Sequence, residues 1–214
     1  MATLDVASYG EATRGGTNNA QGLLLLDSSG ALVIMDLYAK LVMDGYAYQI
    51  RAGTVTTPLV GDQPLAATAA EYCIDTASGK VIIPICQNIS IRLGTGTLHE
   101  YAVKSVATAS TAGTAFVLLP LNIGDTAATS TGRVAAAGGV TVTAELATTT
   151  RRHWSFSQAI AAGAYVADCY WEPLRPPRIA AGNCLYTQIA ATTTGPSYYA
   201  NMDVLELAPA QIGF

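Results

Sequence analysis

Apolar and polar residues alternate through much of the chain after residue 80. Apolar residues recur at every second position in 88–93, 101–104, 140–146 and 153–157. A period of two places neighbouring side chains on opposite faces of a strand, so each run fits a half-buried β-strand. A glycine-rich turn separates the first two runs, which predicts that they pair as an antiparallel hairpin.

Other runs also have the composition of strands: 23–26, 31–38, 46–51, 164–171, 184–191 and 197–207. The first two flank Asp27–Gly30, whose residues favour a turn, and so predict a second hairpin. Turns separate the runs at the spacing expected of a sandwich or barrel. Because strands without intervening helices cannot build a parallel sheet, we predict an all-β chain folded as an antiparallel β-sandwich with at most short helices.

Some segments lack the strand pattern. Residues 65–72 are the best candidate for a short helix, because Ala and Glu favour helix and neither Gly nor Pro interrupts them. We predict loops at 52–64, at 107–113 and at 124–139; the last two are rich in small residues that cannot anchor a core. A loop as long as 124–139 is unusual in a compact domain, and it would suit contact with a neighbouring subunit.

The N-terminal residues show neither the period of two of a strand nor the period of 3.6 of a helix, and they are polar and glycine-rich. We therefore expect a flexible N-terminal arm over residues 1–20. The chain has 214 residues with no flexible join near its middle, a length that suits one sizeable core. The expected organisation is the arm followed by a single β-sandwich domain over residues 21–214.

Charged residues are scarce. They form 12% of the chain, about half the usual fraction of about 25%, whereas hydrophobic residues form 50%. So few charges cannot cover a large surface, and the composition favours surfaces that neighbouring subunits cover. The net charge of −4 gives no broad attraction to phosphate, so we expect no strong nucleic-acid binding.

The beginning of the chain has no basic region followed by an apolar run, so we expect no signal peptide and synthesis in a host cytoplasm. Asp27 and Gly30 interrupt the longest apolar stretch, residues 22–35, so we expect no membrane span. The four cysteines include no Cys-x-x-Cys pair, which predicts four free thiols without a zinc or redox motif.

Residues that could carry catalysis are few. His99 and His153 are the two histidines, and neither belongs to a recognisable catalytic arrangement. The chain contains no Gly-x-Ser-x-Gly elbow, no phosphate-binding loop and no His-Glu-x-x-His motif. We therefore predict that the protein is not an enzyme and has no catalytic, metal or cofactor-binding residues and no cofactor, and we leave an enzyme of unrecognised type as a minor alternative.

The most distinctive segment is Tyr170–Arg178, which contains three prolines, two arginines and two aromatic residues. Proline donates no hydrogen bond to a sheet, so the segment predicts a stiff, extended connection. Trp, Tyr and Arg are also the residues that most often anchor interfaces. Two interpretations stay open, a packed crossover within one domain and a contact between subunits; the candidate interface residues are Tyr170, Trp171, Arg175 and Arg178.

Two stretches near the C-terminus, residues 177–189 and residues 198–207, resemble the closing strands of jelly-roll domains in viral capsid proteins. The composition rich in Ala, Thr and Gly, the N-terminal arm and the lack of catalytic residues are similar to phage virion proteins. The resemblance implies a single jelly roll located in the virion, whose partners are copies of itself and other virion proteins. It implies a subunit that self-assembles into, or decorates, a capsid shell, and it carries over no site residues.

A second hypothesis belongs to a different class, a ligand-binding β-sandwich such as a carbohydrate-recognising domain on a fibre or appendage. Sugar sites combine exposed aromatic residues with Asp and Asn, and one compact set of this kind is present: Tyr198, Tyr199, Asn201 and Asp203. Alternation along a strand sends about half of such a set into the core.

Overall fold

The computed structural model describes residues 37–54, 56–62, 68–93, 99–135, 139–143, 148–156, 168–192 and 195–212. The predicted arm, the predicted strand at 23–26 and most of the predicted strand at 31–38 lie outside these residues. The two helices of the described residues are short, as predicted: α1 spans Leu37–Met43 and the 3-10 helix η2 spans Pro209–Ile212. Residues 37 and 38 therefore belong to a helix, which corrects the end of the predicted strand.

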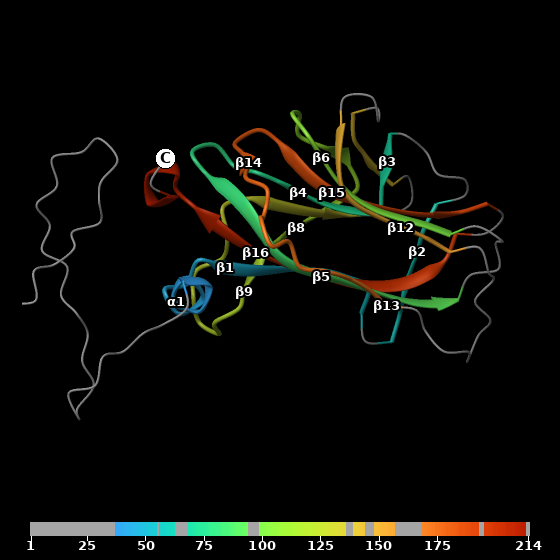
Figure 1. Ribbon diagram of the computed structural model, residues 1–214, viewed down its shortest axis with the longest axis horizontal. Coiled ribbons are helices and arrows are strands. Elements are labelled where there is room, and N and C mark those ends of the chain that lie inside the picture. The colour runs from blue at the N-terminus through green and yellow to red at the C-terminus, as the bar shows by residue number, and fades with distance from the viewer. Residues whose placement is uncertain are drawn as a thin grey trace, which may run out of the picture.

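Eight of the described strands build a two-layered sandwich (Figure 1). They are β1 (Ala47–Ala52), β4 (Tyr72–Asp75), β5 (Val81–Leu93), β6 (His99–Val106), β12 (Thr148–Phe156), β13 (Asp168–Trp171), β15 (Cys184–Ala191) and β16 (Ser197–Leu207). β15 and β16 begin and end where the sequence pattern places them.

The eight strands pair in a nested order. The first pairs with the last, β1 with β16, and inside this pair lie β4 with β15, β5 with β13, and β6 with β12, all antiparallel. Successive pairs alternate between the two sheets, because β16 also pairs with β5 and β15 also pairs with β6. A ribbon of paired strands folded over itself in this way is a jelly roll. The predicted fold class, an antiparallel sandwich of the single jelly-roll type, is confirmed.

Shorter strands extend the sandwich. They are β2 (Leu59–Val60), β3 (Ala69–Ala70), β7 (Thr111–Ala112), β8 (Thr114–Val117), β9 (Leu119–Pro120), β10 (Thr131–Val134), β11 (Val140–Thr141) and β14 (Ile179–Ala180). β9 pairs with β1 in the first sheet, whereas β10 and β8 follow β4 in the second. β3, β11 and β7 form a small third sheet. The predicted loops at 107–113 and 124–139 therefore contain strands, because backbone pairing orders them without large apolar side chains. The predicted loop at 52–64 contains a strand as well, since β2 pairs with β16.

Two other predictions were wrong. In the described part of 65–72, Ala69–Ala70 and Tyr72 lie in strands, because the pairing of β3 with β11 and the burial of Tyr72 in the core outweigh the helix propensity of alanine. The runs 88–93 and 101–104 do not pair with each other. β5 and β6, which contain them, lie in opposite sheets, so each apolar face packs against the other sheet.

The core lies between the two sheets. Every second residue of β16 from Tyr198 to Val204 points inward, and the inner faces of β5 and β15 meet it with Ile89, Ile91 and Leu185. All eight residues of β15 are buried, because the third sheet covers the outer face of this strand. A strand that is covered on both faces loses the alternation that half-buried strands show.

Gln87 forms a polar bridge inside this core. Its side-chain amide donates hydrogen bonds to the Tyr72 hydroxyl and, over 2.9 Å, to Thr187 Oγ1, both on the opposite sheet. Tyr198 is equally buried, but its hydroxyl has no hydrogen-bond partner among the described residues. The hydroxyl of Tyr72 therefore takes part in a hydrogen bond in the core, whereas that of Tyr198 does not.

We predict that Tyr72→Phe lowers the free energy of unfolding by about 1–2 kcal/mol, because the buried Gln87 amide loses an acceptor. Tyr198→Phe removes a hydroxyl without a partner, so it should leave stability unchanged or raise it. Urea unfolding of the two variants beside the wild type measures the difference. Equal losses in both variants would show that the Gln87 bridge contributes nothing specific.

Candidate functional site

Residues 114–123, here called the edge segment, run along one side of the sandwich. β8 is the last described strand of the second sheet and β9 is the last of the first, and Leu118 alone separates them. Within the described part of the chain, the segment therefore forms the edge of both sheets on this side of the sandwich. An unpaired strand edge presents backbone donors and acceptors to any chain that approaches it.

Side chains of the edge segment alternate between the core and the solvent. Phe116 and Leu118 point inward, and Gly132 of β10 makes room for the Phe116 ring, since an added Cβ would lie 2.6 Å from it. Four outward residues are large and apolar, with exposed fractions of 55%, 66%, 36% and 104%: Val117, Leu119, Leu121 and Ile123.

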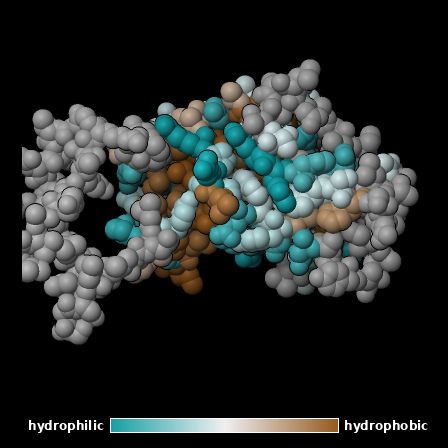
Figure 2. Space-filling view, viewed as in Figure 1, coloured by the Kyte–Doolittle hydropathy of each residue, from teal (hydrophilic) through white to brown (hydrophobic). Residues whose placement is uncertain are grey.

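Helix α1 continues this apolar surface. Asn122 Nδ2 donates a 2.6 Å hydrogen bond to the carbonyl of Val42, which fixes the end of the edge segment against the helix. Met43 and Tyr38 of α1 are exposed as well. Figure 2 shows hydrophobic residues gathered at the end of the molecule where α1 and β9 lie. The edge segment was not predicted from the sequence, because its residues are apolar on both faces. The continuous apolar run 115–121 is the signal that could have revealed it.

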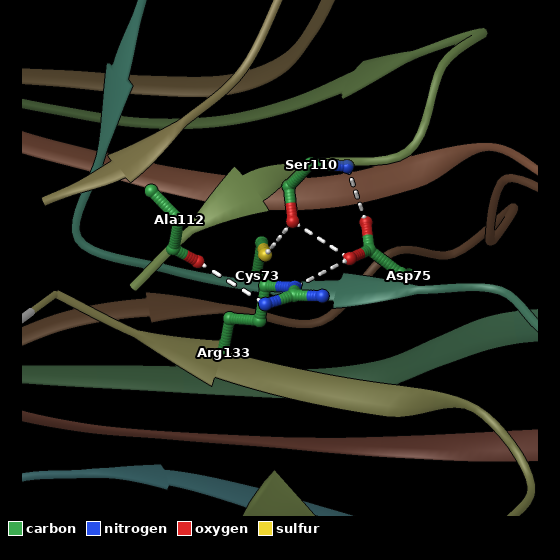
Figure 3. Close-up of polar contacts among 5 residues, drawn as sticks. All are labelled: Cys73, Asp75, Ser110, Ala112 and Arg133. Atoms are coloured by element: carbon green, nitrogen blue, oxygen red, sulfur yellow. Dashed lines mark hydrogen bonds and ion pairs between the residues drawn. The ribbon is translucent and has the colours of Figure 1, made fainter. Parts of the chain in front are cut away.

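Two carboxylates hold the insertion between β6 and β12, the part of the chain that contains the edge segment. Asp75 accepts hydrogen bonds from the Ser110 amide and the Ser110 hydroxyl, both at 2.7 Å, and from Arg133 Nε at 3.1 Å (Figure 3). The buried Glu206 accepts hydrogen bonds from the amides of Thr129, at 2.8 Å, and Ser130, at 2.7 Å. Loops on both sides of the edge segment are thus tied to the central strands.

Cys73, Asp75 and Cys184 place possible metal ligands within 4.8 Å of one another. The surroundings do not suit a cation. Arg133 already balances the charge of Asp75 at 3.1 Å, and both carboxylate oxygens accept hydrogen bonds. A hydrogen bond with Cys73 and burial raise the pKa of the Cys184 thiol well above its ordinary value, whereas metals bind the thiolate. We interpret the cluster as structural, because its hydrogen bonds connect Asp75 to Ser110 and Arg133.

All four cysteines are free thiols, as predicted. Burial raises the pKa of Cys86 to about 11 and that of Cys169 to about 12. Thiols with such values stay protonated at neutral pH and are poor nucleophiles. Neither position therefore has the character of a catalytic cysteine.

A polar hollow of about 450 Å³ lies on the outer face of the first sheet. Its floor follows the register of three strands: Arg51 of β1 lies opposite Asn201 of β16, which lies opposite Asn88 of β5. In the next row Tyr199 neighbours Ser90. The lining contains two arginines, Arg51 and Arg92, and no carboxylate.

The polar set at 198–203 divides between the core and this hollow. Tyr198 is buried in the core, whereas Tyr199 and Asn201 line the hollow. Asp203 shares their face and accepts a 2.8 Å hydrogen bond from Gln49 Nε2. Alternation thus identifies two of the lining residues, while Arg51, Asn88 and Arg92 come from strands far away in the sequence.

The candidate interface at 170–178 is divided in the same way. Tyr170, Arg175 and Arg178 are exposed, but Trp171 is only 8% exposed and packs in the core of its own subunit. The Tyr170 hydroxyl donates a 3.0 Å hydrogen bond to Glu172, which raises the pKa of Tyr170. Trp171 therefore cannot anchor a neighbour without leaving the core, and the surface that remains for a contact is formed by the other three residues.

We predict that Trp171→Ala lowers the free energy of unfolding of the subunit by about 3–5 kcal/mol, the range for a buried Trp. The neighbouring Tyr170→Ala serves as the matched control and should change it by no more than about 0.5 kcal/mol. Urea unfolding measures both. A Trp171→Ala protein that keeps its stability and loses only its assembly would restore the interface interpretation.

The histidines form no catalytic arrangement among the described residues. His153 Nε2 lies 3.8 Å from Glu100 Oε1 across the β6–β12 pair, and both side chains are partly exposed. His99 begins β6, and its side chain lies outside the described residues. A surface ion pair of this kind contributes little to stability.

Glu71 is the most perturbed acid of the described residues. Its side chain is 2% exposed, and its Oε1 accepts a 3.0 Å hydrogen bond from the Asp62 amide. Burial, followed by the charge of Asp62, raises the pKa of Glu71 from 4.5 to about 9. Burial also raises the pKa of Asp62. Glu71 is therefore protonated at neutral pH.

The folded protein retains the Glu71 proton up to about pH 9, whereas the unfolded chain releases it near pH 4.5. Because the folded state binds more protons within this window, stability should fall as the pH rises through it. Glu71→Gln cannot ionise, so the variant should lose this part of the slope. Urea unfolding at about pH 5, 7 and 9 compares the two proteins, and parallel slopes would contradict the assignment to Glu71.

Comparison with known proteins found no protein family and no curated protein that matches this chain. Among the described residues, no helix is long and apolar enough to cross a membrane.

Proposed function

We propose that the protein is a structural subunit of a virus or phage particle, and that it associates with copies of itself through the edge segment. One observation carries the proposal: four large apolar side chains lie exposed on the edge segment, which contains the outermost described strand of each sheet on this side. Exposed apolar patches on a folded domain mark surfaces that a partner covers. With 12% charged residues, the chain has little charge repulsion to prevent two copies from meeting through this surface.

The opposite side of the sandwich supports this choice. There the last described strand of the second sheet is β12, whose residues Arg151, Arg152 and His153 are exposed. Its pairing with β6 also shifts register between Thr150 and Arg152. Charges and irregular pairing are the usual means by which a protein protects an edge from another chain. The edge segment carries no charged residue.

The place in a virion is supported by architecture and resemblance together. Jelly rolls build viral capsid proteins, but also lectins and cupins, so the fold alone does not decide the function. The stretches that resemble closing strands of capsid jelly rolls, 177–189 and 198–207, fall on β14, β15 and β16, which also close this jelly roll. A self-assembling or decorating shell subunit accommodates these observations together with the exposed edge segment.

A ligand-binding sandwich is the second candidate, and one observation favours it. The hollow on the outer face of the first sheet gathers amide, hydroxyl, aromatic and arginine side chains over three strands. Such a site is compatible with a structural role, because a shell or fibre subunit presents one face to its surroundings.

We predict that the double variant Leu119→Ser, Ile123→Ser associates at least about tenfold more weakly than the wild type, since it removes apolar area from the contact. Both side chains are largely exposed, so the free energy of unfolding should change by no more than about 0.5 kcal/mol per substitution. Sedimentation velocity over a range of concentrations measures the association. A wild type that stays monomeric at high concentration would overturn the proposal.

Two controls make the test specific. Val60→Ser removes an apolar side chain of similar exposure, 60%, from β2, which lies at the other end of the sandwich from β9 (Figure 1). It should leave association unchanged. Leu174→Ser removes a 101% exposed side chain from the proline-rich segment at 170–178. If Leu174→Ser weakens association and the double variant of the edge segment does not, the contact lies in the segment 170–178, as the sequence predicts.

A further inference from the structure

Two arginines and no carboxylate are among the residues that line the hollow on the first sheet. Arg51 donates one hydrogen bond, to the uncharged Gln49 Oε1 at 3.3 Å. Arg92 lies over the ring of Tyr199, 5.5 Å from its centroid. Neither guanidinium forms an ion pair with a described residue, and both line the hollow. Two arginines that line one hollow without a carboxylate in its lining favour an anionic ligand.

The acids nearest to the hollow are already engaged. Asp168 accepts a 2.6 Å hydrogen bond from Ser90 Oγ, and Asp203 accepts one from Gln49. Since Ser90 gives its proton to Asp168, its oxygen can only accept a hydrogen bond from a ligand. Ser90 therefore favours a ligand that carries a hydroxyl or N–H group.

The floor between the arginines is made of neutral hydrogen-bonding groups. Side-chain amides offer both donors and a carbonyl acceptor, the combination that sugar hydroxyls require, and the lining contains two of them, Asn88 and Asn201. Asn88 Oδ1 is shut off from solvent, so a ligand in the hollow can use only the amide nitrogen of Asn88.

The size and shape of the hollow suit a small polar molecule. Its volume of about 450 Å³ lies within the range of about 300–1,000 Å³ for small-molecule sites. Its two arginines are too few for a nucleic-acid backbone, which needs a longer row of cations. A bare phosphate or sulfate would use the arginines and leave the amides and Ser90 without a role.

We propose that this hollow binds an acidic sugar, with its carboxylate between Arg51 and Arg92 and its hydroxyl groups against Asn88, Asn201 and Ser90. Tyr199 positions the guanidinium of Arg92 and acts through it. The inference deepens the second candidate function by naming the ligand class, and it does not depend on association through the edge segment. A subunit that stays monomeric would leave it intact.

Calorimetric titration of the full chain tests the proposal with three acidic sugars, D-glucuronate, D-galacturonate and N-acetylneuraminate. Three neutral sugars, D-glucose, D-galactose and N-acetylglucosamine, and sodium sulfate serve as comparison probes. At least one acidic sugar should bind ten times or more tightly than every neutral sugar, with an affinity that falls as the salt concentration rises. If no acidic sugar does so, the proposal is overturned. If sulfate binds as tightly as the best sugar, the hollow is an anion site and the sugar assignment is wrong.

Three arginine variants locate the binding. Arg51→Gln and Arg92→Gln should each weaken binding of the best acidic sugar at least tenfold, because each removes one charged donor from the hollow. Arg152→Gln is the matched control: Arg152 also lies over an aromatic ring, 5.4 Å from that of Trp154, but on the opposite sheet. Its affinity should match the wild type. Equal weakening in all three variants would show a general effect of net charge and would overturn the assignment to the hollow.

Discussion

Hydrogen bonds to two carboxylates, Asp75 of β4 and Glu206 of β16, determine the position of the insertion between β6 and β12. The insertion has few large apolar side chains outside the edge segment, so hydrophobic burial alone does not place it. Asp75 holds Ser110 at its beginning and Arg133 in β10, and Glu206 holds the amides of Thr129 and Ser130. Buried hydrogen bonds to a charged acceptor are stronger than neutral ones, and breaking one leaves an unsatisfied charge. The edge segment lies between these fastenings, so its exposed side chains keep a fixed arrangement.

Burial on two faces organises the rest of the molecule. β15 lies in the middle of the second sheet, with the main core on one face and the third sheet on the other. Among the described elements, none covers the outer face of the first sheet over β1, β16 and β5 where the hollow lies. The two sheets of one jelly roll therefore differ on their outer faces: the second is covered by the third sheet, and the first presents the hollow.

Sequence alone was sufficient to predict the strands that have one apolar and one polar face. β16 alternates inner apolar residues with Tyr199, Asn201 and Asp203, so its bounds were predicted correctly. The pattern identifies the face of a side chain but not the sheet to which its strand belongs, which is why β5 and β6 were paired wrongly. The edge segment was missed because it is apolar on both faces. Trp171 was ambiguous because the same residue types anchor interfaces and fill cores. The hollow needs the register of β1, β16 and β5, which joins residues about 150 positions apart in the chain.

The unequal edges of the sandwich also restrict the symmetry of any assembly. One side exposes apolar strand edges at β8 and β9, whereas the other carries the charges of β12. Two copies that meet through this side around a twofold axis each use their own edge segment, so neither keeps it for a third copy. Association through this side alone therefore ends at a dimer. A closed shell of such subunits requires a second contact of a different kind, and the dimer would be its repeating unit.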